Sequence, residues 1–181
     1  MITVNQKKQI EEAIANALRA FEVEYKNVFH RSEESLRYLV ATEISKLGVF
    51  GTLPNTSRKT PQLLFQYSYQ KFKTRDLVWK PDIISAKFNN NGDIVKPYFA
   101  IELKVNSSDK DFPKCQNYVS QKFGIYAFDL SILININSLK KFELPKYQKI
   151  EKNIKTGSIL WCSLDISRKK GSQGSINTRW Y

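Results

Sequence analysis

Residues 79–84 of the chain read WKPDII and residues 98–105 read YFAIELKV, and these two stretches decide the fold. In the second stretch apolar side chains occupy every other position, while Glu102 and Lys104 stand among the alternate positions. Side chains of a β-strand alternate between two faces, so this pattern predicts a strand with one face in the core. Glu102 and Lys104 then share the opposite face, with Cα atoms about 6.6 Å apart for a rise of roughly 3.3 Å per residue.

A turn-forming sequence, NNNGD at residues 89–93, separates the two stretches and predicts that they pair as neighbouring strands. Asp82 can then face Glu102 across the sheet. Pro81 lacks an N–H for the strand ladder, so its strand should lie at an edge or begin close to Pro81. Two carboxylates and the amine of Lys104, brought together in this way, make a site for a hard cation that prefers oxygen ligands.

Pro81-Asp82 followed after a spacer by Glu102-Leu103-Lys104 resembles the motif of the PD-(D/E)xK nuclease superfamily. The resemblance implies that Asp82, Glu102 and the backbone carbonyl of Leu103 bind Mg²⁺, for which Mn²⁺ is expected to substitute. It also implies that Lys104 positions or activates the attacking water. The simpler interpretation of Glu102 and Lys104 is an ion pair at the surface, worth under about 1 kcal/mol.

The family also has a glutamate early in the helix that precedes its first strand, and this residue reaches the metal site. A helix is predicted here from Ser32, a good N-cap, to Gly48, which ends it. Glu33 in its first turn is the preferred candidate for a catalytic residue. Glu43 is the alternative, because a carboxylate close to the apolar stripe of a helix needs a partner or a metal.

A second helix is predicted for residues 111–123, where the family places a lysine or a Gln-x-x-x-Tyr pattern near the scissile phosphate. The resemblance therefore implies that Gln116, together with Lys114, belongs to the candidate catalytic site. Ser120 stands where the tyrosine of that pattern is expected. Polar residues on the exposed face of a helix are the alternative interpretation.

The predicted fold class is α/β, with a restriction-endonuclease-like αβββαβ core and a mixed central sheet flanked by helices. One domain, residues 1–181, is expected, with its core at about 30–137, a packing helix within 1–25 that could instead form a dimer contact, and a C-terminal extension at 138–181. Periodicity predicts the remaining elements. They are a helix at 5–22, strands at 63–69, 128–136 and 158–166, a helix at 146–155 and a hairpin arm at 176–181.

Composition favours a polyanionic partner, because 29 Lys and Arg residues face 17 Asp and Glu, a net charge of +12. Nucleic acid is the first candidate and an anionic membrane surface the second. Cys115 and Cys162 have no metal-binding spacing and His30 is the single histidine, so zinc is not expected and both thiols should be buried and reduced. No apolar run approaches the roughly 18 residues of a membrane span, and no signal core begins the chain, which predicts a cytoplasmic protein.

These observations together predict a Mg²⁺-dependent endonuclease that hydrolyses phosphodiester bonds of DNA, in restriction, defence or repair. The chain contains no P-loop and no G-x-S-x-G, and no Cys/His pair has a spacing that suits catalysis. Two alternatives stay open: an RNA endonuclease of the same chemistry, and a nucleic-acid-binding module of the same fold with weak or no catalysis. A homodimer would suit the cutting of both strands.

Overall fold

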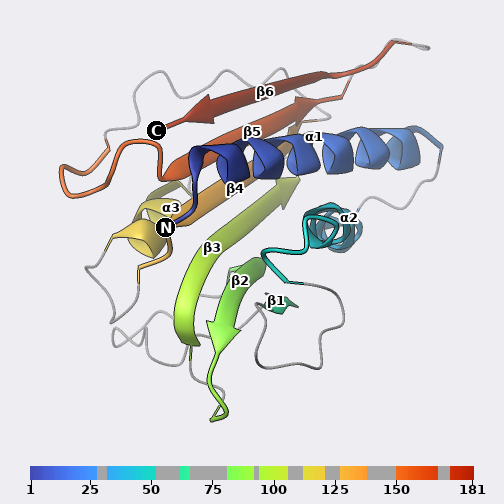
Figure 1. Cartoon of the computed structure of the whole chain (residues 1–181). Helices are drawn as coiled ribbons and strands as arrows, with labels where there is room; N and C mark the ends of the chain where they lie inside the picture. Colours follow the sequence, from blue (N-terminus) through green and yellow to red (C-terminus); the bar gives the residue numbers. More distant parts are fainter. Residues whose placement is uncertain are drawn as a thin grey trace.

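Three helices and a six-stranded mixed sheet make up the described part of the computed structural model (Figure 1). The structure describes residues 1–27, 32–51, 62–65, 81–91, 94–105, 112–120, 127–137, 150–166 and 172–181. The elements are α1 (Val4–Asn27), α2 (Glu33–Ser45), β1 (Gln62–Phe65), β2 (Ile83–Phe88), β3 (Ile94–Val105), α3 (Phe112–Val119), β4 (Leu130–Asn137), β5 (Ile159–Asp165) and β6 (Ser175–Trp180).

The strands lie in the sheet in the order in which they occur along the chain, β1-β2-β3-β4-β5-β6. Three antiparallel pairings, β1 with β2, β2 with β3 and β5 with β6, surround two parallel ones, β3 with β4 and β4 with β5. The prediction of a mixed sheet flanked by helices is therefore confirmed. β4 lies beside β3, as the apolar run at residues 128–136 predicted, and it is buried along its whole length.

The helices cover the two faces of the sheet unequally. α1 and α2 pack on one face, where the main core joins Leu18 and Leu36 to Ile101, Ile134 and Leu160. Figure 1 shows α1 lying across β4 and β5, with α2 beside the end of β3. α3 packs on the other face, where its Phe112 and Cys115 meet Leu133 and Trp161. The helix predicted near the N-terminus is thus a packing helix of the main core.

Ser32 begins α2 as the sequence predicted, since its side-chain oxygen accepts a hydrogen bond from the N–H of Ser35 at 3.1 Å. The helix ends at Ser45, and Gly48 follows with a φ of 69°, a conformation that glycine adopts without strain. Pro81 precedes β2 by two residues, so it lies near the start of its strand, which is one of the two expected positions.

α1 is longer than the helix predicted at 5–22, because Glu22 anchors its last turns to the segment that leads into β6. The Glu22 side chain is only 4% exposed and accepts hydrogen bonds from Lys26 at 2.7 Å, Arg19 at 3.2 Å and the N–H of Gly174 at 2.5 Å. Burial alone would raise the pKa of Glu22, but the bonds from Lys26, Gly174 and Arg19 outweigh it and lower the pKa. At Gly174 a Cβ atom would lie 2.3 Å from the carbonyl oxygen of Asp165, so only glycine fits.

The C-terminal third contains one wrong prediction. Residues 150–155 are irregular, with a turn at 152–153, and residues 146–149 of the predicted helix lie outside the described part. Ile150 and Ile154 have helical spacing, but they cover the α3 side of the sheet from an irregular segment. The strands predicted at 158–166 and 176–181 are confirmed as β5 and β6.

Two other predicted elements lie only partly within the described residues. Of the strand predicted at 63–69, residues 63–65 belong to β1 and the others lie outside the described residues. The helix predicted at 111–123 is α3, and residues 111 and 121–123 are likewise not described. Cys115 and Cys162 are buried, as expected, and neither forms a disulfide bond. Among the described residues, no helix is long and apolar enough to cross a membrane.

Replacing Glu22 with alanine should lower the free energy of unfolding by about 2 kcal/mol at pH 7, because several charge-assisted hydrogen bonds are lost. Since its pKa is lowered, this contribution should be present at neutral pH and decline as the pH falls below about 4.5. Urea unfolding at pH 7 and pH 4 measures both effects. The matched control is Glu24→Ala on an exposed position of the same helix, which should change stability by less than about 0.5 kcal/mol. Equal effects of the two substitutions would contradict the anchoring role of Glu22.

Candidate functional site

The candidate site lies where β2 begins beside the end of β3. The antiparallel register pairs Ile83 with Ile101, and the N–H of Asp82 donates to the carbonyl of Ile101 at 2.9 Å. Asp82 immediately precedes β2 at this end of the sheet, and its charge acts on Glu102, so the two carboxylates lie near each other. That Asp82 faces Glu102 directly across the sheet stays a prediction. Asp82 is 7% exposed and Glu102 is 2% exposed, so the two carboxylates are held inside the protein. This burial excludes the interpretation of Glu102 as half of a surface ion pair.

Asp82 is bound through both of its oxygen atoms. Its Oδ2 accepts a hydrogen bond from the N–H of Leu103 at 2.8 Å, which fixes the start of β2 against β3. Its Oδ1 accepts a hydrogen bond from Nη2 of Arg37 at 2.8 Å. Sequence analysis did not identify Arg37. The available signal was its position in α2 four residues after Glu33, which turns both side chains to the same side of the helix.

Glu102 receives its contacts from α3. Its Oε1 accepts a hydrogen bond from the hydroxyl of Tyr118 at 2.5 Å, and its Oε2 lies 3.9 Å from Nζ of Lys114. Lys114 was carried into the site by the resemblance, whereas Tyr118 had no predicted role. Lys114 and Tyr118 are four residues apart on the helix, and this spacing was the signal for a shared target.

The protonation of Glu102 is displaced towards neutral pH. Burial is the largest effect and raises the pKa of Glu102. The hydrogen bond from Tyr118 and the charge of Lys114 lower this pKa, and the neighbouring charge of Asp82 raises it. The net result is a pKa raised to about 7. Burial and the same Glu102 carboxylate raise the pKa of the Tyr118 hydroxyl. A buried acid with a raised pKa beside a second carboxylate is typical of sites where a cation binds or a proton moves.

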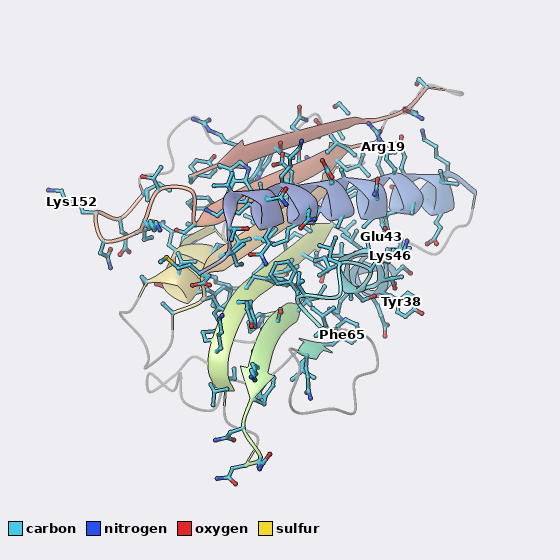
Figure 2. The ribbon with its side chains drawn as sticks, in the orientation of Figure 1. Arg19, Tyr38, Glu43, Lys46, Phe65 and Lys152 are labelled. Carbon is cyan, nitrogen blue, oxygen red and sulfur yellow. The ribbon has the colours of Figure 1, made fainter. Side chains whose placement is uncertain are left out.

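Lys104 approaches Glu33, not Glu43. Nζ of Lys104 lies 3.8 Å from Oε1 of Glu33, with side-chain exposures of 21% and 39%. Glu43 is paired with Lys46 on the same helix, and Figure 2 shows these two residues together on α2. The partner that a carboxylate near the apolar stripe requires is therefore Lys46. Of the two candidate glutamates, the structure brings Glu33 to the site.

Gln116 takes part in a different contact. It is 8% exposed, and its Oε1 accepts a hydrogen bond from the N–H of Glu151 at 3.0 Å. This bond ties α3 to the segment that precedes β5. Among the described residues, no hydrogen bond joins Gln116 to Asp82, Glu102 or Lys104.

Asn135 lies next to the site on β4. The parallel register pairs it with Lys104, and it shares the α3 face of the sheet with Glu102 because Glu102 pairs with Leu133. Asn135 is 2% exposed, and within the described chain neither atom of its amide has a hydrogen-bond partner. An unpaired buried amide is costly, so a water or a ligand is expected there. Sequence analysis missed Asn135 because it stands within an apolar run.

The charged side chains of the site that the structure describes form three ion pairs. Three acids, Asp82, Glu102 and Glu33, contact three cations, Arg37, Lys114 and Lys104. Carboxylate oxygens are the ligands that Mg²⁺ and Mn²⁺ take, so the donor set of Asp82 and Glu102 suits a hard divalent cation. The described residues contain no group of three or more His, Cys, Asp or Glu placed to hold a metal ion, so a cation here would rely on two carboxylates. The carbonyl of Leu103 as a further ligand stays a prediction.

Comparison of the chain with models of protein families, with curated proteins and with solved structures found no match. A proposal for the function therefore depends on the geometry of the site and on the charge of the chain.

The raised pKa of Glu102 predicts a pH dependence of stability. The folded protein keeps a proton on Glu102 that the unfolded chain loses above about pH 4.5, so this group stabilises the fold at low pH and the contribution is lost as the pH rises through 7. Glu102→Gln has no such proton. The free energy of unfolding of the native protein, relative to Glu102→Gln, should fall by up to about 3 kcal/mol between pH 4 and pH 8.

Urea titrations of both proteins in metal-free buffer measure this difference. Glu24→Gln, at an exposed position, serves as the control and should follow the native protein at both pH values. Parallel pH profiles for the native protein and Glu102→Gln would contradict the raised pKa.

Proposed function

We propose that the protein is a Mg²⁺-dependent endonuclease that hydrolyses phosphodiester bonds of DNA. The observation that carries the proposal is a pair of buried carboxylates, Asp82 and Glu102, near enough for the charge of Asp82 to act on Glu102, with Lys104 two residues after Glu102 on β3. Glu33 adds a third carboxylate beside Lys104. The pattern Pro81-Asp82 and Glu102-Leu103-Lys104 resembles that of the PD-(D/E)xK nucleases, and the order α2, β1, β2, β3, α3, β4 is the order expected from that resemblance.

Asp82 and Glu102 would hold the cation, which when bound neutralises phosphate charge and acidifies its water. Lys104 would orient the attacking water and offset the charge that develops on the phosphate. Tyr118 fixes the rotamer of Glu102 through its hydroxyl, and the N–H of Leu103 does the same for Asp82. These positioning bonds come from α3 and from the neighbouring strand, so the acids are preorganised before any ligand binds.

Charge supports a nucleic-acid substrate. The chain carries a net charge of +12, which favours a polyanionic partner. Among the residues that the structure describes, the site has three acids and three cations. A divalent ion added to this balanced set gives it net positive charge, and a phosphodiester complements that charge. We further propose a cytoplasmic location, in which the thiols of Cys115 and Cys162 would stay reduced.

Two alternative functions share these features. An RNA endonuclease would use the same residues, since contacts to phosphate do not distinguish the 2′-hydroxyl. A binding module with weak or no catalysis is favoured by one observation, the engagement of both Asp82 oxygens by Arg37 and Leu103. Salt-dependent binding of DNA without cleavage under any divalent cation would select the binding module.

Asp82→Ala, Glu102→Ala and Lys104→Ala should each lower Mg²⁺-dependent cleavage at least about 100-fold, because each removes a group that acts at the reacting phosphate. Cleavage of plasmid DNA, single-stranded DNA and single-stranded RNA at equal phosphate concentration measures the effect and identifies the substrate.

The control is Glu43→Ala, which should retain cleavage because Glu43 pairs with Lys46 away from the acids. Glu33→Ala should lower cleavage, since Glu33 contacts Lys104. Undiminished cleavage in both Asp82→Ala and Lys104→Ala would overturn the assignment of the site.

A further inference from the structure

Arg37 forms the most buried ion pair of the site. Its Nη2 donates to Oδ1 of Asp82 at 2.8 Å, and the two side chains are 13% and 10% exposed. The other cations contact their acids at longer range, with 3.8 Å for Lys104 to Glu33 and 3.9 Å for Lys114 to Glu102. Arg37 is therefore the cation that neutralises Asp82 in the protein without metal.

The guanidinium of Arg37 has a hydrogen-bond donor to spare. Its Nε is buried, and it has no hydrogen-bond partner in the part of the chain that the structure describes. A buried donor without an acceptor is unfavourable, and a guanidinium binds an oxyanion best through two N–H groups at once. With Asp82, Arg37 uses Nη2 and leaves Nε unpaired, so an oxyanion that took both would be a better partner.

A divalent cation at Asp82 changes this balance. The cation and the guanidinium would compete for the same carboxylate in a buried place, where the repulsion between like charges is weakly screened. The second oxygen of Asp82 already accepts the N–H of Leu103, so the carboxylate has little room to turn away. Release of Arg37 from Asp82 relieves the repulsion and leaves a guanidinium beside the cation.

We propose that Arg37 is a phosphate-binding residue that is held by Asp82 until a divalent cation takes its place. The inference rests on the proposed function, because it assumes that the cation binds at Asp82. The phosphodiester of the substrate supplies the oxyanion that the displaced guanidinium then binds. Cation and nucleic acid consequently bind cooperatively: each favours the state in which Arg37 has left Asp82.

The first part of the proposal is that Arg37 competes with the cation for Asp82. Electron paramagnetic resonance tests it by measuring the binding of Mn²⁺ in the absence of nucleic acid. Arg37→Gln removes the competing charge and should bind Mn²⁺ at least about fivefold more tightly than the native protein, within the range of ordinary coupling between two sites. Lys46→Gln removes one cation from the same helix away from Asp82 and should bind Mn²⁺ like the native protein.

The second part of the proposal is that the displaced Arg37 binds phosphate. Fluorescence anisotropy at fixed salt tests it by measuring the binding of a short DNA duplex in the presence of Ca²⁺. Arg37→Gln should bind the duplex about tenfold more weakly than the native protein, and Lys46→Gln should not. Arg37→Lys keeps the charge but lacks the planar pair of donors, so it should bind Mn²⁺ like the native protein and the duplex more weakly. This variant carries the test if Arg37→Gln does not fold.

The outcomes separate the inference from the proposed function. If Asp82→Asn abolishes Mn²⁺ binding while Arg37→Gln binds Mn²⁺ no more tightly than the native protein, the inference is overturned and the metal site stands. If Asp82→Asn leaves Mn²⁺ binding unchanged, the metal site and the inference both fail.

Discussion

The carboxylate of Asp82 joins three parts of the chain that are distant in sequence. It accepts hydrogen bonds from the N–H of Leu103 on β3 and from the guanidinium of Arg37 on α2. The backbone N–H of Asp82 donates a hydrogen bond to the carbonyl of Ile101. These bonds hold the start of β2 against β3 and keep Asp82 near Glu102. A buried carboxylate is stable only with such partners, so the same bonds that fix the strand also satisfy the oxygen atoms of Asp82. Fold and candidate site therefore depend on one side chain.

Much of the sheet could be predicted from local pattern. The alternation of residues 98–105 identified the core face of β3, and the turn residues between the two stretches predicted its partner. The N-cap at Ser32 was equally local, because its oxygen reaches an N–H three residues away. The helix predicted at 146–155 was wrong in its described part, because spacing at i and i+4 indicates only which residues face the same way. In this segment, burial by β5 and α3 decides the backbone conformation.

The contacts that complete the site could not be predicted, because they depend on how helices dock on the sheet. Arg37 and Tyr118 reach Asp82 and Glu102 only after α2 and α3 pack on opposite faces. Sequence spacing places Arg37 on the same side of its helix as Glu33, and Tyr118 on the same side as Lys114. It does not show which acid Arg37 or Tyr118 contacts. Asn135 was hidden for another reason: a strand buried on both faces reads as a continuous apolar run, and one amide within it gives no periodic signal.

Crystals grown with Mn²⁺ show whether Asp82 and Glu102 bind a divalent cation together. Anomalous scattering locates Mn²⁺ without assumptions about the protein. Shared binding predicts a strong anomalous peak between the carboxylates of Asp82 and Glu102, within about 2.5 Å of an oxygen of each. An empty position between these carboxylates at saturating Mn²⁺, with peaks only at other acids, would contradict it.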